Sequence, residues 1–157
     1  MGEQIRVLIA DDIEETRVNV ARLLEFERDL AVVAQAGDGQ EAVELALEHR
    51  PDCILMDINM PVLDGIAATE RISMALPETV IIMMSVQGEQ DYLRQAMLAG
   101  AREYLIKPFS GDELVHAVKS AVALERRRRA PRTPAKPGKI ITVFSPKGGV
   151  GKTLIAT

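Results

Sequence analysis

The sequence predicts an α/β protein built on a doubly wound, five-stranded parallel sheet with helices on both faces. Short apolar runs rich in branched residues alternate five times with segments of helical periodicity between residues 5 and 127. These runs are almost continuously apolar, as is typical of parallel strands buried on both faces. Acidic residues and a lysine follow the ends of the runs, where an open sheet of this class places its functional site.

Each predicted strand is an apolar run that ends at a turn or at the start of a helix. The five strands are expected at residues 5–10, 31–36, 53–57, 79–84 and 103–106. Gly37-Asp38-Gly39 predicts a turn after the second strand. The crossovers between parallel strands should be right-handed.

The five predicted helices follow the strands in turn. They are expected at residues 14–27, from Ala42 to just before Pro51, and at 64–75, 89–99 and 110–127. Gly100 suits a helix C-terminus, and Ser110 with Glu113 has capping-box spacing. The apolar positions at helical spacing in the first, second and last helices are Val18, Ala21, Leu23, Leu24; Ala42, Val43, Leu45, Ala46, Leu47; and Leu114, Val115, Val118, Ala121, Val122, Leu124.

Composition excludes several classes of protein. The chain has 157 residues, 47% of them hydrophobic, which suffices for one packed domain and a tail. It has no apolar run of about 18 residues and no basic-then-apolar N-terminus, so neither a membrane span nor a secretory signal is expected. Cys53 is the single cysteine, which excludes an intrachain disulfide and fits a cytoplasmic protein.

Charge divides the chain near residue 126. All 23 acidic residues lie at or before Glu125, whereas nine basic residues and no acid follow. Such a basic segment can indicate nucleic-acid or membrane binding, but we favour a solvated helix end and a linker, with no nucleic acid bound by this chain. We expect a domain over residues 1–127, a Pro/Arg-rich linker over 128–139 and a further segment over 140–157.

Three acids, a hydroxyl and a lysine should meet at the carboxyl edge of the sheet. They are Asp11, Asp12, Asp57, Ser85 and Lys107. Neighbouring carboxylates repel one another, and Mg²⁺ relieves this repulsion by taking oxygen ligands. An aspartate can accept a phosphoryl group, while Lys107 neutralises charge and the Ser85 hydroxyl donates to a phosphoryl oxygen.

One set of residues points to a known family: Asp11-Asp12, the string LMDINMPVLDG around Asp57, Ser85, Tyr104 and Lys107-Pro108. Together these residues closely resemble the CheY-like receiver domains of response regulators, and the resemblance covers about residues 5–125. The resemblance implies the flavodoxin-like strand order 2-1-3-4-5. It implies that Asp57 is the phosphoacceptor and that Mg²⁺ is held by Asp11, Asp12, Asp57 and the backbone carbonyl of Asn59. It further implies that Tyr104 is a switch residue moving with Ser85, and that the Lys107–Pro108 bond is cis.

The same resemblance implies partners and an activity. A sensor histidine kinase or a phosphotransfer protein would supply the phosphoryl group, and the receiver would catalyse its own phosphorylation and slow dephosphorylation. Both a monomer and a homodimer through the last helix remain open.

A second motif lies in the basic tail. KGGVGKT follows an apolar run, and its glycines, lysines and threonine are suited to binding nucleotide phosphates. The candidates are Lys147, Gly148, Gly149, Gly151, Lys152 and Thr153. Pro146 stands where a strict Walker A motif has glycine, and the string resembles the deviant P-loop of MinD/ParA ATPases. We expect the start of such a domain in a longer protein, with ATP bound only there and no ATP hydrolysis by this chain.

The order of receiver and ATPase resembles the CpaE/TadZ proteins, which place pilus assembly machinery at the cell pole. The leading interpretation is a phosphorylation switch controlling a C-terminal ATPase. A receiver of a DNA-binding transcriptional regulator is the first alternative, although the P-loop string counts against it. A receiver used only for dimerisation is the second alternative.

Overall fold

The structure is a computed structural model that describes residues 4–86 and 90–129. The chain divides into two compact units, Met1–Arg126 and Arg127–Thr157, and all five strands belong to the first. The P-loop candidates at residues 147–153 and the predicted segment 140–157 lie outside the described residues.

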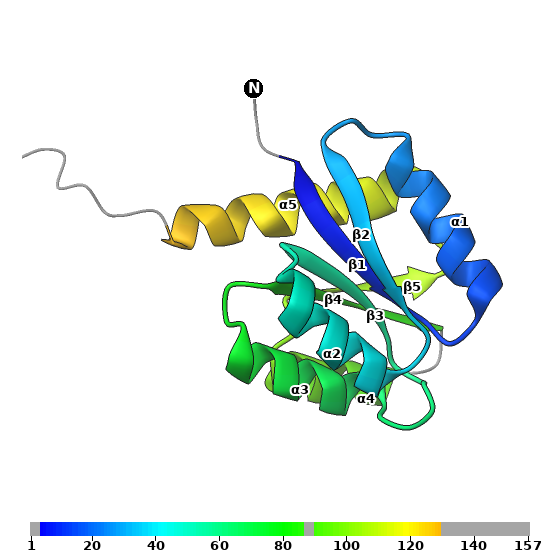
Figure 1. Cartoon of the computed structure of the whole chain (residues 1–157), viewed down its shortest axis with the longest axis vertical. Coiled ribbons are helices and arrows are strands. Elements are labelled where there is room, and N and C mark those ends of the chain that lie inside the picture. Colours follow the sequence, from blue (N-terminus) through cyan, green and yellow to red (C-terminus); the bar gives the residue numbers. More distant parts are fainter. Residues whose placement is uncertain (1–3, 87–89, 130–157) are drawn as a thin grey trace, which may run out of the picture. The chain divides into compact units, whose positions relative to one another are not determined.

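Strands and helices alternate along the described chain (Figure 1). The strands are β1 (Ile5–Ala10), β2 (Leu30–Ala36), β3 (Cys53–Asp57), β4 (Val80–Val86) and β5 (Glu103–Lys107). The helices are α1 (Glu14–Glu25), α2 (Gly39–His49), α3 (Gly65–Ala75), α4 (Gln90–Ala99) and α5 (Gly111–Arg129). All neighbouring strands are parallel, in the order β2-β1-β3-β4-β5, which confirms the predicted fold.

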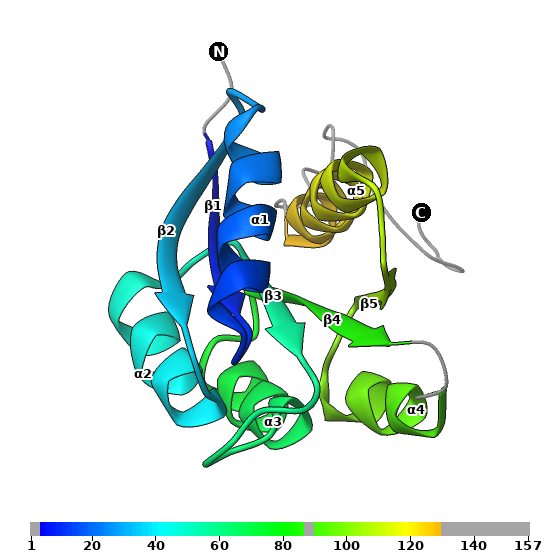
Figure 2. The same ribbon diagram turned by 90° about the vertical axis from the view of Figure 1, so that its right-hand side faces the viewer.

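The sheet separates two layers of helices, with α1 and α5 on one face and α2, α3 and α4 on the other (Figure 2). Successive strand side chains point to opposite faces, so β1 contributes to both cores. Val7 and Ile9 pack in the core beneath α1 and α5. Leu8 and Ala10 pack in the core beneath α2, α3 and α4. The fully apolar strand pattern is therefore explained by two-sided burial.

Three of the apolar residues at helical spacing do not lie in the core. Val18, Leu47 and Leu124 are 40%, 49% and 54% exposed. In α1, Val20 turns inward in place of Val18, beside Ala21 and Leu24. A helix that packs on one sheet face buries only a stripe, so apolar residues to either side of it stay in solvent.

The strand ends also differ slightly from prediction. β4 begins at Val80 and continues through Ser85 and Val86, so Ser85 lies within the strand and not after it. Lys107 is likewise the last residue of β5. Pairing with β5 extends β4, because Ser85 faces Ile106 and Val86 faces Lys107 in the β4–β5 register.

Local signals in the sequence are confirmed around the last strand. Ser110 Oγ accepts from the Glu113 backbone N–H at 3.0 Å, and Glu113 Oε1 accepts from the Ser110 N–H at 2.8 Å. Gly100 ends α4 with a φ of +126°, a conformation that favours glycine. The Lys107–Pro108 peptide is cis.

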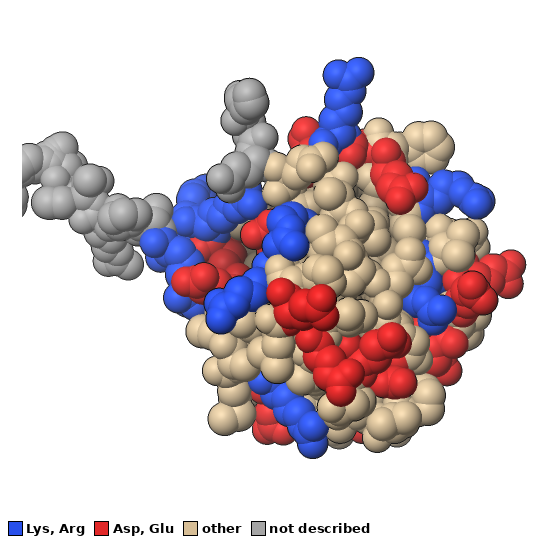
Figure 3. Space-filling view, viewed as in Figure 1, with Lys and Arg blue, Asp and Glu red and all other residues tan. Residues whose placement is uncertain are grey.

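Charge is unevenly spread over the face shown in Figure 3, with basic side chains around the C-terminal end of α5 and acidic ones over α2. Among the described residues, no helix is both long enough and apolar enough to cross a lipid bilayer.

Candidate functional site

Three aspartates meet at the carboxyl edge of the sheet. β1 and β3 are neighbouring strands, and Ala10 pairs with Met56 in their register. The next residues along the chain, Asp11 and Asp57, therefore lie close together. One carboxylate oxygen from each of Asp11, Asp12 and Asp57 lies within 4.8 Å of the others, a spacing suited to one metal ion. Asp11 is buried, Asp57 is half-buried and Asp12 is exposed. The set consists only of hard oxygen donors, which is the chemistry that Mg²⁺ prefers.

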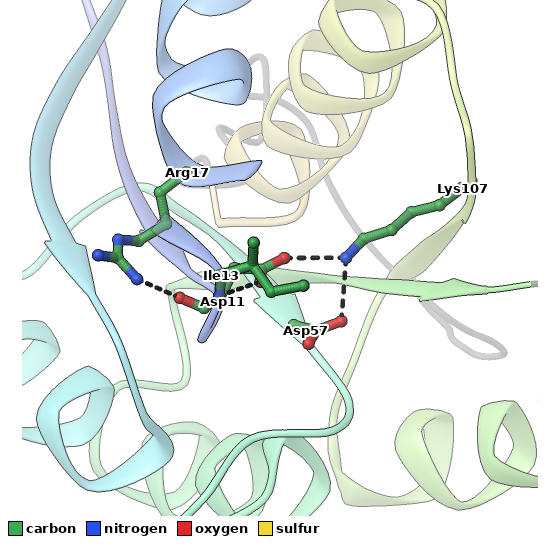
Figure 4. Close-up of polar contacts among 5 residues, drawn as sticks. All are labelled: Asp11, Ile13, Arg17, Asp57 and Lys107. Carbon is green, nitrogen blue, oxygen red and sulfur yellow. Dashed lines mark hydrogen bonds and ion pairs between the residues drawn. The ribbon is translucent and has the colours of Figure 1, made fainter. Parts of the chain in front are cut away.

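Lys107 joins two of these carboxylates from the end of β5 (Figure 4). Its Nζ lies 2.9 Å from Asp11 Oδ2 and 3.3 Å from Asp57 Oδ1. Both are charge-assisted contacts in a partly buried setting, where they are stronger than on an open surface. The sequence-based expectation that strands β1, β3 and β5 bring these three residues together is met.

Electrostatics set the protonation of the two central groups. Burial raises the pKa of Asp57 to about 6, opposed by the charge of Lys107 and reinforced by the charges of Asp11 and Asp12. Burial lowers the pKa of Lys107, but the hydrogen bonds and charges of Asp11 and Asp57 outweigh it and leave that pKa above its ordinary value. The lysine is therefore cationic at neutral pH, and Asp57 is predominantly ionised.

Ser85 lies on β4, the strand beside the one that carries Asp57, and Tyr104 lies on β5, which is next to β4. The Ser85 side chain is buried, and its hydroxyl has no hydrogen-bond partner within the described part of the chain. Tyr104 on β5 is 43% exposed, so its ring points outward. A buried hydroxyl without a hydrogen-bond partner lowers the stability of the fold. It would donate a hydrogen bond to an acceptor that binds nearby and so stabilise the bound group.

Backbone close to Asp57 is shaped by one glycine. A Cβ on Gly65 would lie 2.0 Å from the Asp57 carbonyl oxygen, so any side chain there would displace the loop. The Gly65 N–H donates to the Ile58 carbonyl at 2.8 Å and closes the loop that carries Asn59. Asn59, two residues after Asp57, therefore lies in a loop whose two ends are joined by a hydrogen bond.

Two features of the site were not predicted. Val62, in the same loop, has a φ of +69°, a conformation rare for β-branched residues. Arg17 on α1 donates from Nη1 to the Asp11 carbonyl at 2.6 Å. A basic residue one turn into the helix after an acidic pair could have indicated Arg17, whereas no sequence signal indicated Val62.

The fold and this cluster define a class: a doubly wound α/β protein with a carboxylate–lysine site at the strand ends. Residues 7–119 match the response regulator receiver domain family, and the chain belongs to that family. It is the receiver domain of a two-component response regulator.

Individual relatives agree with this assignment. The chain is 38% identical over 116 residues to the transcriptional regulatory protein DegU of Brevibacillus brevis, covering 74% of this chain and 49% of DegU. It is 42% identical over 118 residues to the transcriptional regulatory protein PdtaR of Mycobacterium tuberculosis, covering 75% of this chain and 57% of PdtaR. The chain thus spans about half the length of these relatives.

Solved structures confirm the fold. The response regulator domain of Thermotoga maritima CheB matches with a TM-score of 0.71 and 35% identity, over 77% of this chain and 98% of that domain. The receiver domain of the putative response regulator NarL from Mycobacterium tuberculosis matches with a TM-score of 0.74 and 34% identity, over 78% of this chain and 98% of that one.

Proposed function

We propose that Asp57 accepts a phosphoryl group and that the three-aspartate cluster binds Mg²⁺. The observation that carries the proposal is the convergence of Asp11, Asp12 and Asp57 on one point, with Lys107 in contact with two of them. A carboxylate beside a fixed cation and a metal-binding pair has the groups that phosphoryl transfer requires.

Asp11, Asp12 and Asp57 would hold the ion, together with the Asn59 carbonyl. The bound Mg²⁺ supplies positive charge that offsets the charge of the transferring phosphoryl group. Metal binding also lowers the repulsion among the three carboxylates.

Transfer begins when an Asp57 oxygen attacks the phosphorus of a phosphohistidine. Lys107 contacts Oδ1, and Oδ2 accepts no hydrogen bond from the described residues, which leaves it open for attack. The new O–P bond forms as the P–N bond breaks, and the electron pair leaves with the donor imidazole. Lys107 neutralises charge on the phosphoryl oxygens during the transfer. Hydrolysis by water later returns the carboxylate and inorganic phosphate.

The switch uses Ser85 and Tyr104. The unpartnered Ser85 hydroxyl would turn to donate to a phosphoryl oxygen, and the outward Tyr104 ring would move into the space this vacates. Because Tyr104 lies on β5, the movement changes the surface formed by α4, β5 and α5. That surface is where phosphorylation would be read, including by a second copy of the chain in a homodimer.

Mass spectrometry after incubation with acetyl phosphate and Mg²⁺ tests the phosphoacceptor. The wild type should gain one phosphoryl group, and Asp57→Asn should gain none. Asp64→Asn is a matched control, since Asp64 lies in the same loop and caps α3 through Oδ1, a cap that asparagine also provides. Full labelling of Asp57→Asn would disprove the assignment.

For the output, we propose a receiver over residues 1–127, a linker over 128–139 and the start of a MinD/ParA-like ATPase over 140–157. The KGGVGKT string supports this division. The receiver would then control ATP binding by that domain, and the domain order resembles that of pilus assembly proteins. Binding of a fluorescent ATP analogue by the longer protein, lost in Lys152→Ala, would support the proposal.

A DNA-binding output is the second candidate, because DegU and PdtaR are transcriptional regulatory proteins by name. The residues after Thr157 discriminate the two. A metal-binding aspartate motif of the MinD/ParA type supports the ATPase, and a helix-turn-helix supports the regulator.

A further inference from the structure

Asp12 is the least supported member of the aspartate cluster. Its side chain is exposed and makes no hydrogen bond or ion pair within residues 4–86 and 90–129. One of its oxygens nevertheless lies within 4.8 Å of oxygens of Asp11 and Asp57. Within the described residues, the two peptide groups that flank Asp12 are the parts of its surroundings that hydrogen bonds hold in place.

Both flanking peptide groups are anchored (Figure 4). Before Asp12, the carbonyl of Asp11 accepts from Arg17 Nη1 at 2.6 Å. After Asp12, the N–H of Ile13 donates to Asp11 Oδ1 at 2.9 Å. The second anchor uses a carboxylate that is itself a proposed ligand. Among the described residues, Arg17 is the one side chain from outside the metal cluster that makes a hydrogen bond to these two peptide groups.

Arg17 is well placed to act as such an anchor. It lies in the first turns of α1, where its own N–H donates to the Ile13 carbonyl at 3.1 Å, so its backbone is fixed to the same loop. Its Nη1 also approaches the loop after β2, since a Cβ on Gly37 would lie 3.5 Å from it. A planar guanidinium held at this position fixes the direction of a hydrogen bond better than a flexible ammonium does.

We propose that Arg17 is a positioning residue for the metal site, holding the Asp11–Asp12 peptide so that the Asp12 carboxylate faces Asp11 and Asp57. This inference rests on the proposed Mg²⁺ site. A nearby positive charge by itself weakens the binding of a cation. Removing Arg17 would therefore raise the Mg²⁺ affinity if only its charge mattered, and would lower it if Arg17 positions Asp12. The sign of the change in Mg²⁺ affinity therefore separates them.

Isothermal titration of the full 157-residue chain with Mg²⁺ measures that sign. Arg17→Ala should weaken Mg²⁺ binding by about tenfold or more, the loss typical when a residue that orients a metal ligand is removed. Arg17→Lys should recover part of the affinity, because the ammonium can still donate to the carbonyl. Arg22→Ala is the control: it removes the same charge from an exposed position on the same helix and should leave the affinity unchanged.

A second measurement distinguishes positioning from a general loss of structure. In phosphorylation by acetyl phosphate, Arg17→Ala should need more Mg²⁺ for the half-maximal rate yet reach the wild-type maximum at saturating Mg²⁺. If Arg17→Ala bound Mg²⁺ as tightly as the wild type or more tightly, or if its maximal phosphorylation rate were lower, the role of Arg17 would be disproved and the proposed Mg²⁺ site would stand. Absence of Mg²⁺ binding by the wild type would overturn the metal site and the inference together. If Arg17→Ala does not fold by circular dichroism, Arg17→Gln takes its place with the same expected direction.

Discussion

At the scale of single residues, Asp57 is held in an environment that opposes its charge. Its pKa is raised from 3.8 to about 6, with burial as the main cause. A folded-state pKa above the unfolded value means that the native state loses stability as pH rises from about 4 to about 6. The same residue that makes the site reactive therefore weakens the metal-free fold at neutral pH.

We predict that Asp57→Asn stabilises the metal-free protein by about 1 kcal/mol at pH 8. This value is smaller than the free energy that corresponds to the full pKa shift, because solvent reaches part of the side chain and screens its charge. Lys107 keeps its 2.9 Å contact with Asp11 in this variant. Urea denaturation in the presence of a chelator measures the gain, which should shrink at pH 5. Added Mg²⁺ should then stabilise the wild type more than the variant. If the stabilisation by Asp57→Asn instead grew as the pH falls, the expected pH dependence would be wrong.

Val62 provides a second prediction about a single residue. It has a φ of +69°, and the Leu63 N–H donates to the Pro61 carbonyl at 2.7 Å, which defines a strained three-residue turn centred on Val62. Its side chain is 80% exposed, so little packing is lost on its removal. Val62→Gly should therefore raise the free energy of unfolding by about 0.5–1 kcal/mol, after the greater freedom of glycine in the unfolded chain is subtracted.

Urea denaturation tests this against Val18→Gly, the same substitution at an exposed position inside α1. That control should destabilise by several tenths of a kcal/mol to about 1, because glycine is a poor helix former. Destabilisation by both variants would show that Val62 is not strained.

Residues at this scale differ in how well sequence predicts them. Asp11 follows β1 directly, and Asp57 and Lys107 are the last residues of β3 and β5. Parallel pairing necessarily brings these strand ends to one edge. Arg17 and Val62 depend on loop paths that no periodicity specifies. Arg17 contacts a backbone carbonyl, which every residue possesses, and Val62 adopts a conformation that its residue type disfavours.

At the scale of elements, α5 is tied to the strand next to it by an ion pair. Arg102, just before β5, pairs with Glu125 near the end of α5, and the Glu125 side chain is only 5% exposed. Removing a cation from beside a buried carboxylate weakens the stabilisation of that charge, which water reaches poorly. This pair fixes the helix whose end leads into the second unit.

Arg102→Ala should therefore destabilise the protein by about 2–3 kcal/mol, at the low side of the range for buried pairs because Arg102 is partly exposed. Thermal and urea denaturation measure the loss. Arg94→Ala, at an exposed position on α4, should have no comparable effect. The double variant Arg102→Met/Glu125→Met should recover much of the loss, since it removes both charges. Failure of that recovery would mean that packing, and not the loss of the Arg102 charge beside Glu125, causes the loss.

Element types were more predictable than helix faces. The three central strands, β1, β3 and β4, are buried on both sides, so their apolar runs need no assumption about orientation. A helix buries one stripe, and its rotation depends on neighbours that the sequence does not locate. This is why Val18 and Leu124 share the helical spacing of the core residues but lie in solvent.

At the scale of the whole molecule, both hydrophobic cores are complete before the basic segment begins. The buried residues of the two clusters extend from Ile5 to Val122. The compact unit ends at Arg126, one residue after the last acid of the chain. The change in charge that the sequence shows therefore coincides with the boundary of a packed unit, which sequence alone could place only by composition.

From this boundary we predict that a chain ending after Arg129 keeps the stability and chemistry of the longer one. Its urea midpoint and its Mg²⁺-dependent phosphorylation by acetyl phosphate should match those of the full chain, because it retains both cores and the Arg102–Glu125 pair. A chain ending after Ser120 should be markedly less stable, since it loses the buried Val122 and Glu125. A substantial loss of stability on ending the chain at Arg129 would show that the basic segment is part of the folded unit. Equal stability of the two shortened chains would instead show that α5 contributes little beyond Ser120.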